Sequence, residues 1–286
     1  MEPLRIGIIN RTINMLDFQL AQEGGIYASH GLDVTFDTLA GKESTDALQA
    51  GKLDVVVSIG AAARAIMKES APLRVALMVH RNAPHWLMAR AGIQDQGDLR
   101  GKLVQAAQPG SEPDLMVRRW LSEGGLDPDT DVTLTYERAH PGWTEDGPSP
   151  REDAAIARTL EQEVLDARGY HTLLDLCERY PDTLVHGLVV TEAFVAQRRT
   201  ALRALVEAHR EVASWIDQAR PEAVAFIQQR WKVSPERAQR ACRSLNGRFV
   251  ARLDPAELGP VIGASAKATG KQPLTVERFI TTAGIG

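Results

Sequence analysis

Two arginines stand just beyond the ends of apolar segments, Arg11 after residues 4–9 and Arg81 after residues 73–79. The planar guanidinium of arginine can hold a carboxylate or a sulfonate through two parallel hydrogen bonds. We therefore predict that both side chains contact an anion. The alternatives are a salt bridge at a domain edge for Arg81 and simple solvent exposure for Arg11. Lys42 is a weaker third candidate, because a lysine in a turn is usually exposed.

Two histidines lie close to Arg81 in the segment HRNAPH, at positions 80 and 85. Imidazoles can serve acid–base chemistry or metal binding. No third ligand or carboxylate lies nearby in the sequence, so we predict no metal site. If the chain is an enzyme, we predict that His80, His85 and Arg81 are catalytic. The alternative for both histidines is a hydrogen-bonded role in a cleft or hinge.

The segment ALQAGKLDVVVSIGAAARAIMKES, residues 47–70, places small residues where an expected strand meets an expected helix. The apolar run ends at Ser58, and Gly60 is followed by three alanines. A helix start presents unpaired N–H groups and a partial positive charge. No acidic residue occupies this first turn, so an anion or a carbonyl can approach the backbone at Gly60 and Ala61. The alternative is that small residues only allow close helix–sheet packing.

Strand patterns alternate with helical patterns through the first half of the chain, and this alternation predicts a parallel sheet covered by helices. The carboxyl ends of parallel strands share one edge, and ligands of such sheets bind there. The candidate ligand contacts at this edge are Asn10, Arg11, Thr12, Gly41, Lys42, Ser58, Gly60, Ala61, His80 and Arg81.

A second unit is expected to begin near residue 93. It contains an expected helix from Ser111, and the alanine-rich segment 153–169 is also expected to be helical. The segment 186–191 is again expected to form a strand. Gly187 in this strand is expected to allow close approach of the backbone. Beyond it the pattern is almost entirely helical.

Composition excludes several classes of function. The 286 residues suit two domains, and the net charge of −4 gives no basic excess for nucleic acid or anionic membrane. No apolar run approaches the roughly 18 residues of a membrane helix. The N-terminus leads almost directly into a strand without a secretory signal. We therefore expect either a cytoplasmic protein or one whose leader has been removed.

The sequence lacks the motifs of several other kinds of catalytic or cofactor site. Cys177 and Cys242 lie in helical patterns and are expected to be buried thiols. The sequence contains no G-x-S-x-G, no G-x-G-x-x-G and no P-loop, so we expect neither a serine nucleophile nor a nucleotide cofactor. No cofactor of any kind is predicted.

The order of four segments resembles the type II periplasmic solute-binding proteins of ABC importers. These segments are LAQEGGIYASHGLDV, LQAGKLDVVVSIG, DLRGKLVQAAQPGS and EGGLDPDTDV. They are most similar to the binders of nitrate, sulfonates, taurine and thiamine-pyrimidine precursors. The resemblance implies a two-lobed α/β fold, each lobe a mainly parallel sheet flanked by helices, with a helical C-terminal region.

In this family the ligand lies in a cleft between lobes that close by hinge motion. The resemblance implies that lobe one is residues 1–92 with 186–286, and that lobe two is 93–185. It assigns the strand-end residues above to the cleft and adds Gln108, Gly110 and Ser111 of lobe two. The implied function is binding of a small anionic or polar organic solute, with an ABC permease as a possible partner. No nucleic-acid partner and no membrane insertion are expected.

Two departures from the family keep an alternative open. The chain shows no leader, and a proline-rich segment, 139–151, replaces the usual loop of the second lobe. An importer role implies a periplasmic or extracellular location, whereas a chain made without a leader is cytoplasmic. The alternative is a cytoplasmic enzyme on the same fold that acts on an aromatic or heterocyclic acid, such as a decarboxylase, desulfinase or pyrimidine synthase. The strand end Asn10–Thr12 lacks the cysteine of the desulfinases, and no cysteine cluster like that of the pyrimidine synthases is present.

Overall fold

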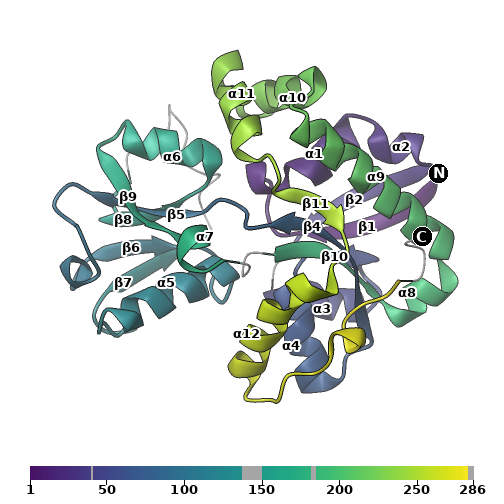
Figure 1. Cartoon of the computed structure of the whole chain (residues 1–286), viewed down its shortest axis with the longest axis horizontal. Helices are drawn as coiled ribbons and strands as arrows, with labels where there is room; N and C mark the ends of the chain where they lie inside the picture. The colour runs from purple at the N-terminus through teal and green to yellow at the C-terminus, as the bar shows by residue number, and fades with distance from the viewer. Residues whose placement is uncertain (40, 137–149, 182–184, 283–286) are drawn as a thin grey trace. The chain divides into compact units, whose positions relative to one another are not determined.

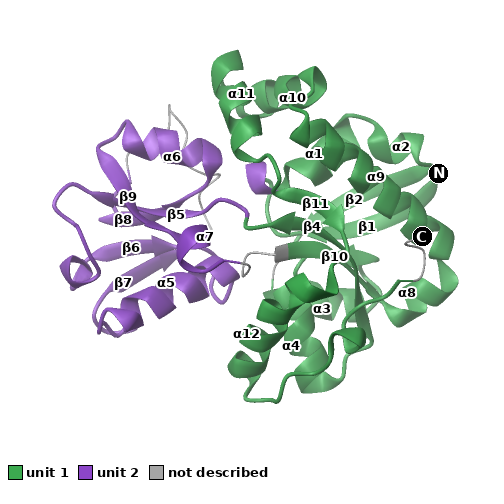
Figure 2. Ribbon diagram, viewed as in Figure 1, with its two compact units in different colours: residues 1–11, 15–82, 185–286 green, residues 12–14, 83–184 purple. Residues whose placement is uncertain are grey.

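The chain folds into two compact units, shown in Figure 2. Unit 1 comprises Met1–Arg11, Met15–Asn82 and Val185–Gly286, and unit 2 comprises Thr12–Asn14 and Ala83–Leu184. The computed structural model describes residues 1–39, 41–136, 150–181 and 185–282. The proline-rich segment singled out in the sequence lies almost wholly outside these residues.

Unit 1 is built on a sheet with the strand order β11-β4-β10-β3-β1-β2 among the described residues (Figure 1). β1 pairs in parallel with both β2 and β3, whereas β10 runs antiparallel to both β3 and β4. The strands β1 to β4 therefore all point the same way. Their bounds are β1 Glu2–Ile8, β2 Leu32–Thr38, β3 Val55–Val56, β4 Leu73–Arg81, β10 Val185–Thr191 and β11 Phe249–Arg252.

Helices cover both faces of this sheet (Figure 1). α1 packs against α2 and α9 on one face, and α4 packs against α3 and α12 on the other. The second face has an apolar core that includes Leu48, Ile66 and Ile262. The helices of unit 1 are α1 Leu16–Glu23, α2 Ile26–Ser29, α3 Gly41–Gln49, α4 Ile59–Glu69, α8 Glu192–Gln197, α9 Arg199–Asp217, α10 Pro221–Trp231, α11 Pro235–Ser244 and α12 Gly259–Thr269.

Unit 2 has a smaller sheet with the order β7-β6-β8-β5-β9 in the described part of the chain. β6 is parallel to β7 and β8, and β5 is antiparallel to β8 and β9. Its elements are β5 Trp86–Arg90, β6 Leu103–Ala106, α5 Glu112–Glu123, β7 Thr133–Tyr136, β8 Ala154–Ala157, α6 Thr159–Asp166, β9 Tyr170–Asp175 and α7 Leu176–Arg179. β5 thus belongs to the sheet of unit 2, whereas the predicted boundary between the lobes follows residue 92.

The helix predicted over residues 153–169 is partly wrong. Its first part is the strand β8, and only Thr159–Asp166 is helical. The prediction failed because alanine favours helices when nothing else decides. Here the four residues of β8 are fully buried between β6 and β5, with Ile156 in the core of one face and Ala155 in that of the other. Burial on both faces removes the polar alternation that marks a half-exposed strand.

The α/β prediction is confirmed in both units, although each sheet is mixed rather than purely parallel. The predicted helical C-terminal region is also confirmed, since α8 to α12 occupy most of residues 192–269 and only the short β11 interrupts them.

Candidate functional site

The carboxyl ends of β1 to β4 meet at one edge of the sheet of unit 1. The register pairs Ile8 with Thr38 and Gly7 with Val56, which fixes the ends of the first three strands at a common level. β1 lies between β3 and β2. The loop that follows β1 therefore lies between the starts of α4 and α3, which follow β3 and β2 respectively. The strand order brings together Asn10, Arg11, Gly41, Ser58 and Gly60 at this edge.

Arg11 is an exposed cation at this edge. Its guanidinium carbon lies 5.9 Å from the centre of the Phe36 ring at the end of β2. Stacking on an aromatic face orients the guanidinium while leaving its N–H donors available. Among the residues that the structure describes, no acidic side chain forms an ion pair with Arg11. The side chain is thus available for an external anion.

The first turn of α4 has the composition that the sequence indicated. No acidic residue lies in it, and the Ser58 side chain makes no capping hydrogen bond. Gly60 and Ala61 are buried. In contrast, at α5 of unit 2 the backbone N–H of Gly110 donates to Asp114 Oδ2 at 2.7 Å. The start of α5 is therefore occupied by its own carboxylate, and the start of α4 is not.

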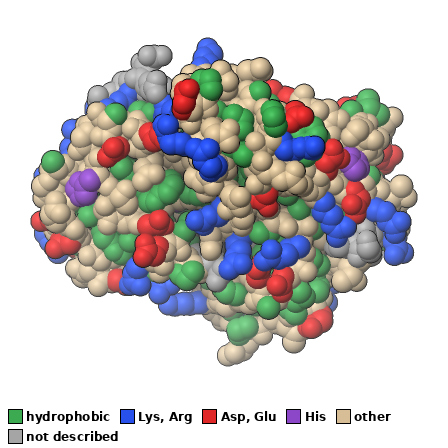
Figure 3. All heavy atoms as spheres, turned by 45° about the horizontal axis from the view of Figure 1, so that its top comes forward, with side chains coloured by type: hydrophobic (Ala, Val, Ile, Leu, Met, Phe, Trp, Pro, Cys, Tyr) green, Lys and Arg blue, Asp and Glu red, His purple; other side chains and the backbone are tan. Residues whose placement is uncertain are grey.

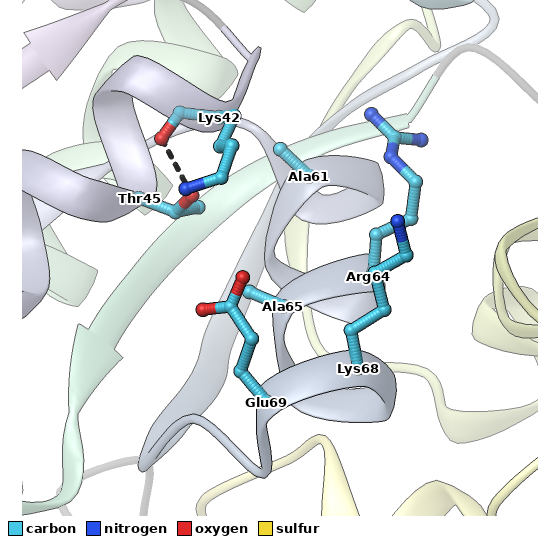
Figure 4. A pocket seen from close by; sticks show the side chains of 7 residues that line it. All are labelled: Lys42, Thr45, Ala61, Arg64, Ala65, Lys68 and Glu69. Atoms are coloured by element: carbon cyan, nitrogen blue, oxygen red, sulfur yellow. Dashed lines mark hydrogen bonds between the residues drawn. The ribbon is translucent and has the colours of Figure 1, made fainter. Parts of the chain in front are cut away.

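A pocket of about 150 Å³ lies between α3 and α4 (Figure 4). Lys42 and Ala61, both predicted ligand contacts, line it together. Lys42 Nζ donates to both carboxylate oxygens of Asp46, at 2.7 and 2.8 Å. Lys42 is therefore paired with an acid of its own helix. Arg64 and Lys68 are the other two basic side chains that line the pocket. The full lining is Lys42, Thr45, Ala61, Arg64, Ala65, Lys68 and Glu69.

His80 belongs to a buried polar network rather than to the surface of the edge. Its Nε2 lies 2.8 Å from Asp17 Oδ1, and His209 Nδ1 lies 3.2 Å from Asp17 Oδ2. Tyr27 completes the network through a 2.9 Å hydrogen bond between its hydroxyl and His209 Nε2. All four side chains are at most 2% exposed. The network joins β4 to α1, α2 and α9 across one face of the sheet.

The electrostatics of this network hold Asp17 ionised. Burial would raise the pKa of Asp17, but the adjacent His80 and His209 outweigh it and hold that pKa well below its usual range. Burial, together with the negative charge of Asp17, raises the pKa of Tyr27 well above its usual value. His80 is therefore a buried, hydrogen-bonded histidine inside unit 1, and its predicted roles in ligand binding and catalysis stay predictions.

Arg81 makes an ion pair within unit 1. Its Nη1 donates to Glu257 Oε1 at 2.9 Å, and Arg252 pairs with the same carboxylate. The Arg81 side chain is 38% exposed. The salt bridge considered as an alternative is present, and the anion contact of Arg81 stays a prediction.

His85 and the remaining predicted contacts lie in unit 2. His85 is 4% exposed, and its Nδ1 lies 2.8 Å from the carbonyl oxygen of Ala83. Burial, together with the positive charge of Arg158, lowers the pKa of His85 to about 3, so the ring is neutral. Ser111 is the residue before α5 and its side chain does not cap that helix. Thr12, Gln108 and Gly110 are loop residues of the same unit.

Sequence reasoning missed Asp17, His209, Arg158 and Asn14. Asp17 stands between apolar residues in the segment MLDFQL, and a lone acid in an apolar stretch is a signal of a buried charge. Arg158 was hidden by the helix predicted over it. His209 and Asn14 carry no such local signal, because tertiary contacts alone give them their partners.

Within the described part of the chain, no group of three or more His, Cys, Asp or Glu side chains could hold a metal ion. No described helix has both the length and the apolar character to cross a bilayer. On the face drawn in Figure 3, Lys and Arg side chains are interspersed with Asp and Glu side chains.

Comparison with known proteins supports the fold. The model of the NMT1-like family matches residues 1–136. No curated protein matches the chain. A protein from Bordetella bronchiseptica RB50 is similar over 98% of this chain and 95% of its own, with 18% identity and a TM-score of 0.78.

The names of two further solved structures state a molecule that each protein binds. The alkanesulfonate-binding protein SsuA from Xanthomonas axonopodis pv. citri, bound to MOPS, is similar over 99% of this chain and 98% of its own, with 16% identity and a TM-score of 0.68. A mutant of DszB in complex with biphenyl-2-sulfinic acid is similar over 98% and 96%, with 15% identity and a TM-score of 0.61. At these identities the likeness shows the fold. The chain has the two-lobed α/β fold of the type II periplasmic binding proteins, as the order of its segments indicated, and its N-terminal part matches the NMT1-like family.

Proposed function

We propose that the protein binds a small anionic organic solute and serves as the substrate-binding component of an ABC importer. One observation carries this proposal: the strand order places the exposed Arg11 between the starts of α3 and α4, and the start of α4 has no acid and no side-chain cap. A cation beside the start of a helix suits a sulfonate or carboxylate head group. The likeness to an alkanesulfonate-binding protein supports the same chemistry.

Replacing Arg11 with alanine is expected to weaken anion binding by about 10- to 100-fold, the usual worth of hydrogen bonds to a charged group. The measurement is a thermal-shift screen of alkanesulfonates, aromatic sulfonates, aromatic carboxylates, pyrimidines and nitrate, followed by titration calorimetry of the best ligand. Arg203→Ala is the matched control, because Arg203 is an exposed arginine of α9 in the same unit. Full ligand stabilisation in Arg11→Ala, equal to that of the control, would show that Arg11 does not hold the anion.

Replacing Arg81 with alanine separates its two possible roles. The Arg81–Glu257 pair is more than one third exposed on the arginine side, so its loss is expected to lower the free energy of unfolding by no more than about 1 kcal/mol. We expect a clear loss of ligand affinity with little change in the melting temperature. The reverse result, a lower melting temperature with unchanged affinity, would assign Arg81 to structure alone.

Import would require the chain to act outside the cytoplasm, so we propose a periplasmic location and a permease partner. The genomic start and its neighbours test this part. A leader upstream of Met1, or adjacent genes for a permease and an ATPase, is the expected finding. A start at Met1 without such neighbours would favour the cytoplasmic alternative.

The likeness to DszB is the observation that favours a second candidate, an enzyme acting on an aromatic or heterocyclic acid. The strand end Asn10–Thr12 offers no cysteine for a desulfinase mechanism. A decarboxylase remains as the form of this alternative. Product analysis by mass spectrometry with each ligand that raises the melting temperature decides between the candidates. Turnover that His85→Gln abolishes without a loss of affinity would establish the enzyme.

A further inference from the structure

The pocket between α3 and α4 has a floor of small side chains. Ala61 and Ala65 lie one turn apart on α4 and line the pocket, and they are 5% and 8% exposed. Larger side chains at these two positions would fill the space between the helices. The cavity of about 150 Å³ therefore exists because both residues are alanine.

The wall on the α3 side carries its own counter-charges. Lys42 Nζ donates to the carboxylate of Asp46, and Glu69 lies on the same side of the pocket as Lys42 (Figure 4). The hydrogen bond to Asp46 raises the pKa of Lys42, and the negative charge of Glu69 adds to this effect. Two acids accompany the single lysine, so this wall has no excess of positive charge.

The opposite wall is formed by Arg64 and Lys68 of α4 (Figure 4). These residues are four positions apart, so their side chains are neighbours on one face of the helix. Two like charges in this arrangement repel each other and weaken a helix. No acidic side chain pairs with Lys68 in the part of the chain that the structure describes. An anion between the two side chains would offset their repulsion.

We propose that this pocket is a second anion site of unit 1, which binds the oxygens of a phosphate, sulfate, sulfonate or carboxylate group through Arg64 and Lys68. Arg64 can hold two oxygens of such a group with parallel N–H donors, and Lys68 adds a compact positive charge. The site goes beyond the proposed function and does not depend on Arg11, whose guanidinium stacks on Phe36 at the end of β2. The oxyanion is either a free inorganic ion or a second acid group of the solute.

The first experiment titrates inorganic phosphate and sulfate into the full chain and follows binding by calorimetry. We expect binding that Arg64→Gln and Lys68→Gln each weaken by about 10-fold or more, the usual worth of hydrogen bonds to a charged group. Arg11→Ala is expected to leave this binding in place. A melting curve of each variant without anion checks folding.

Two further variants separate the pocket from general surface charge. Ala65→Leu keeps every charge but fills the floor of the pocket, and we expect it to abolish the binding of phosphate. Lys267→Gln removes an exposed lysine from the last turn of α12, outside the pocket, and is expected to leave the affinity unchanged. Full binding by Ala65→Leu, or equal losses in Lys267→Gln and Lys68→Gln, would overturn the site. Lys68→Gln, at an exposed position, decides if Ala65→Leu does not fold.

A pair of organic probes identifies the source of the oxyanion. Benzenesulfonate and benzene-1,3-disulfonate differ by one acid group. Tighter binding of the disulfonate, with this preference lost in Arg64→Gln, would assign the pocket to a second acid group of the solute. Binding of phosphate or sulfate without such a preference would assign it to a free ion. Absence of both results would refute the site. Unchanged binding of benzenesulfonate by Arg11→Ala would instead count against the proposed function alone.

Discussion

Replacing Asp17 with asparagine is expected to lower the free energy of unfolding by roughly 1–3 kcal/mol, the usual cost of leaving a buried polar group without its hydrogen-bond partner. Asp17 is 1% exposed and faces two imidazoles, His80 at 2.8 Å and His209 at 3.2 Å. Asparagine keeps the shape but replaces one carboxylate oxygen with an N–H donor, so one histidine loses its acceptor. Chemical denaturation followed by circular dichroism measures the change.

Asp33→Asn is the matched control, because Asp33 is an exposed aspartate of β2 in the same unit. It is expected to change the free energy of unfolding by less than about 0.5 kcal/mol. If Asp17→Asn costs no more than this control, the network of Asp17, His80 and His209 does not stabilise unit 1.

The same network predicts a direction for the pH dependence. The folded-state pKa of Asp17 is lowered by its two histidine neighbours, despite the opposing effect of burial. Such a carboxylate stabilises the fold above its unfolded pKa of roughly 3.9, and the stabilisation is lost as the pH falls toward the folded value. The difference in stability between the wild type and Asp17→Asn is therefore expected to shrink below about pH 4. A constant difference between pH 3 and pH 7 would contradict this origin.

Gly187→Ala is the second substitution with a large expected effect. A Cβ at this position of β10 would overlap the carbonyl oxygen of Leu77 in β4 and lie 2.7 Å from Ile59 Cδ1. A backbone oxygen cannot rotate away, so β10 must shift and strain its 3.1 Å hydrogen bond to the carbonyl of Val57. We expect a loss of about 1–3 kcal/mol or more in the free energy of unfolding, measured by chemical denaturation.

Gly263→Ala provides the opposite control. Gly263 lies within α12, and a Cβ there meets no atom within 4 Å. The substitution is expected to stabilise the protein by about 0.5–1 kcal/mol, because alanine is the better helix former. A similar loss of stability in both variants would show that steric overlap at Gly187 is not the cause.

Much of the fold could be predicted from local patterns. The apolar runs of β1 and β4 and the bare start of α4 were visible in the sequence, as was the need for close approach at Gly187, which the overlap with Leu77 confirms. These features depend on residue type and spacing over fewer than about ten residues, which is the range that periodicity reports.

The partners of the polar residues could not be predicted in the same way. Asp17, His80 and His209 are separated by 63 residues or more, and nothing in their neighbourhoods specifies one another. Arg158 was concealed for a different reason: four buried residues rich in alanine precede it, and alanine favours a helix unless tertiary burial decides otherwise. Burial and long-range pairing decided both cases.

The position of β10 has a consequence for biosynthesis. This strand lies between β3 and β4 in the middle of its sheet, yet it is made only after residues 83–184 have left the ribosome. The strands of unit 2, by contrast, all fall within Trp86–Asp175, so its sheet can close while the sheet of unit 1 still lacks its central strand. All strands of unit 2 are therefore translated before the sheet of unit 1 can be completed. Unit 1, which contains the N-terminus, is the last of the two units to finish folding.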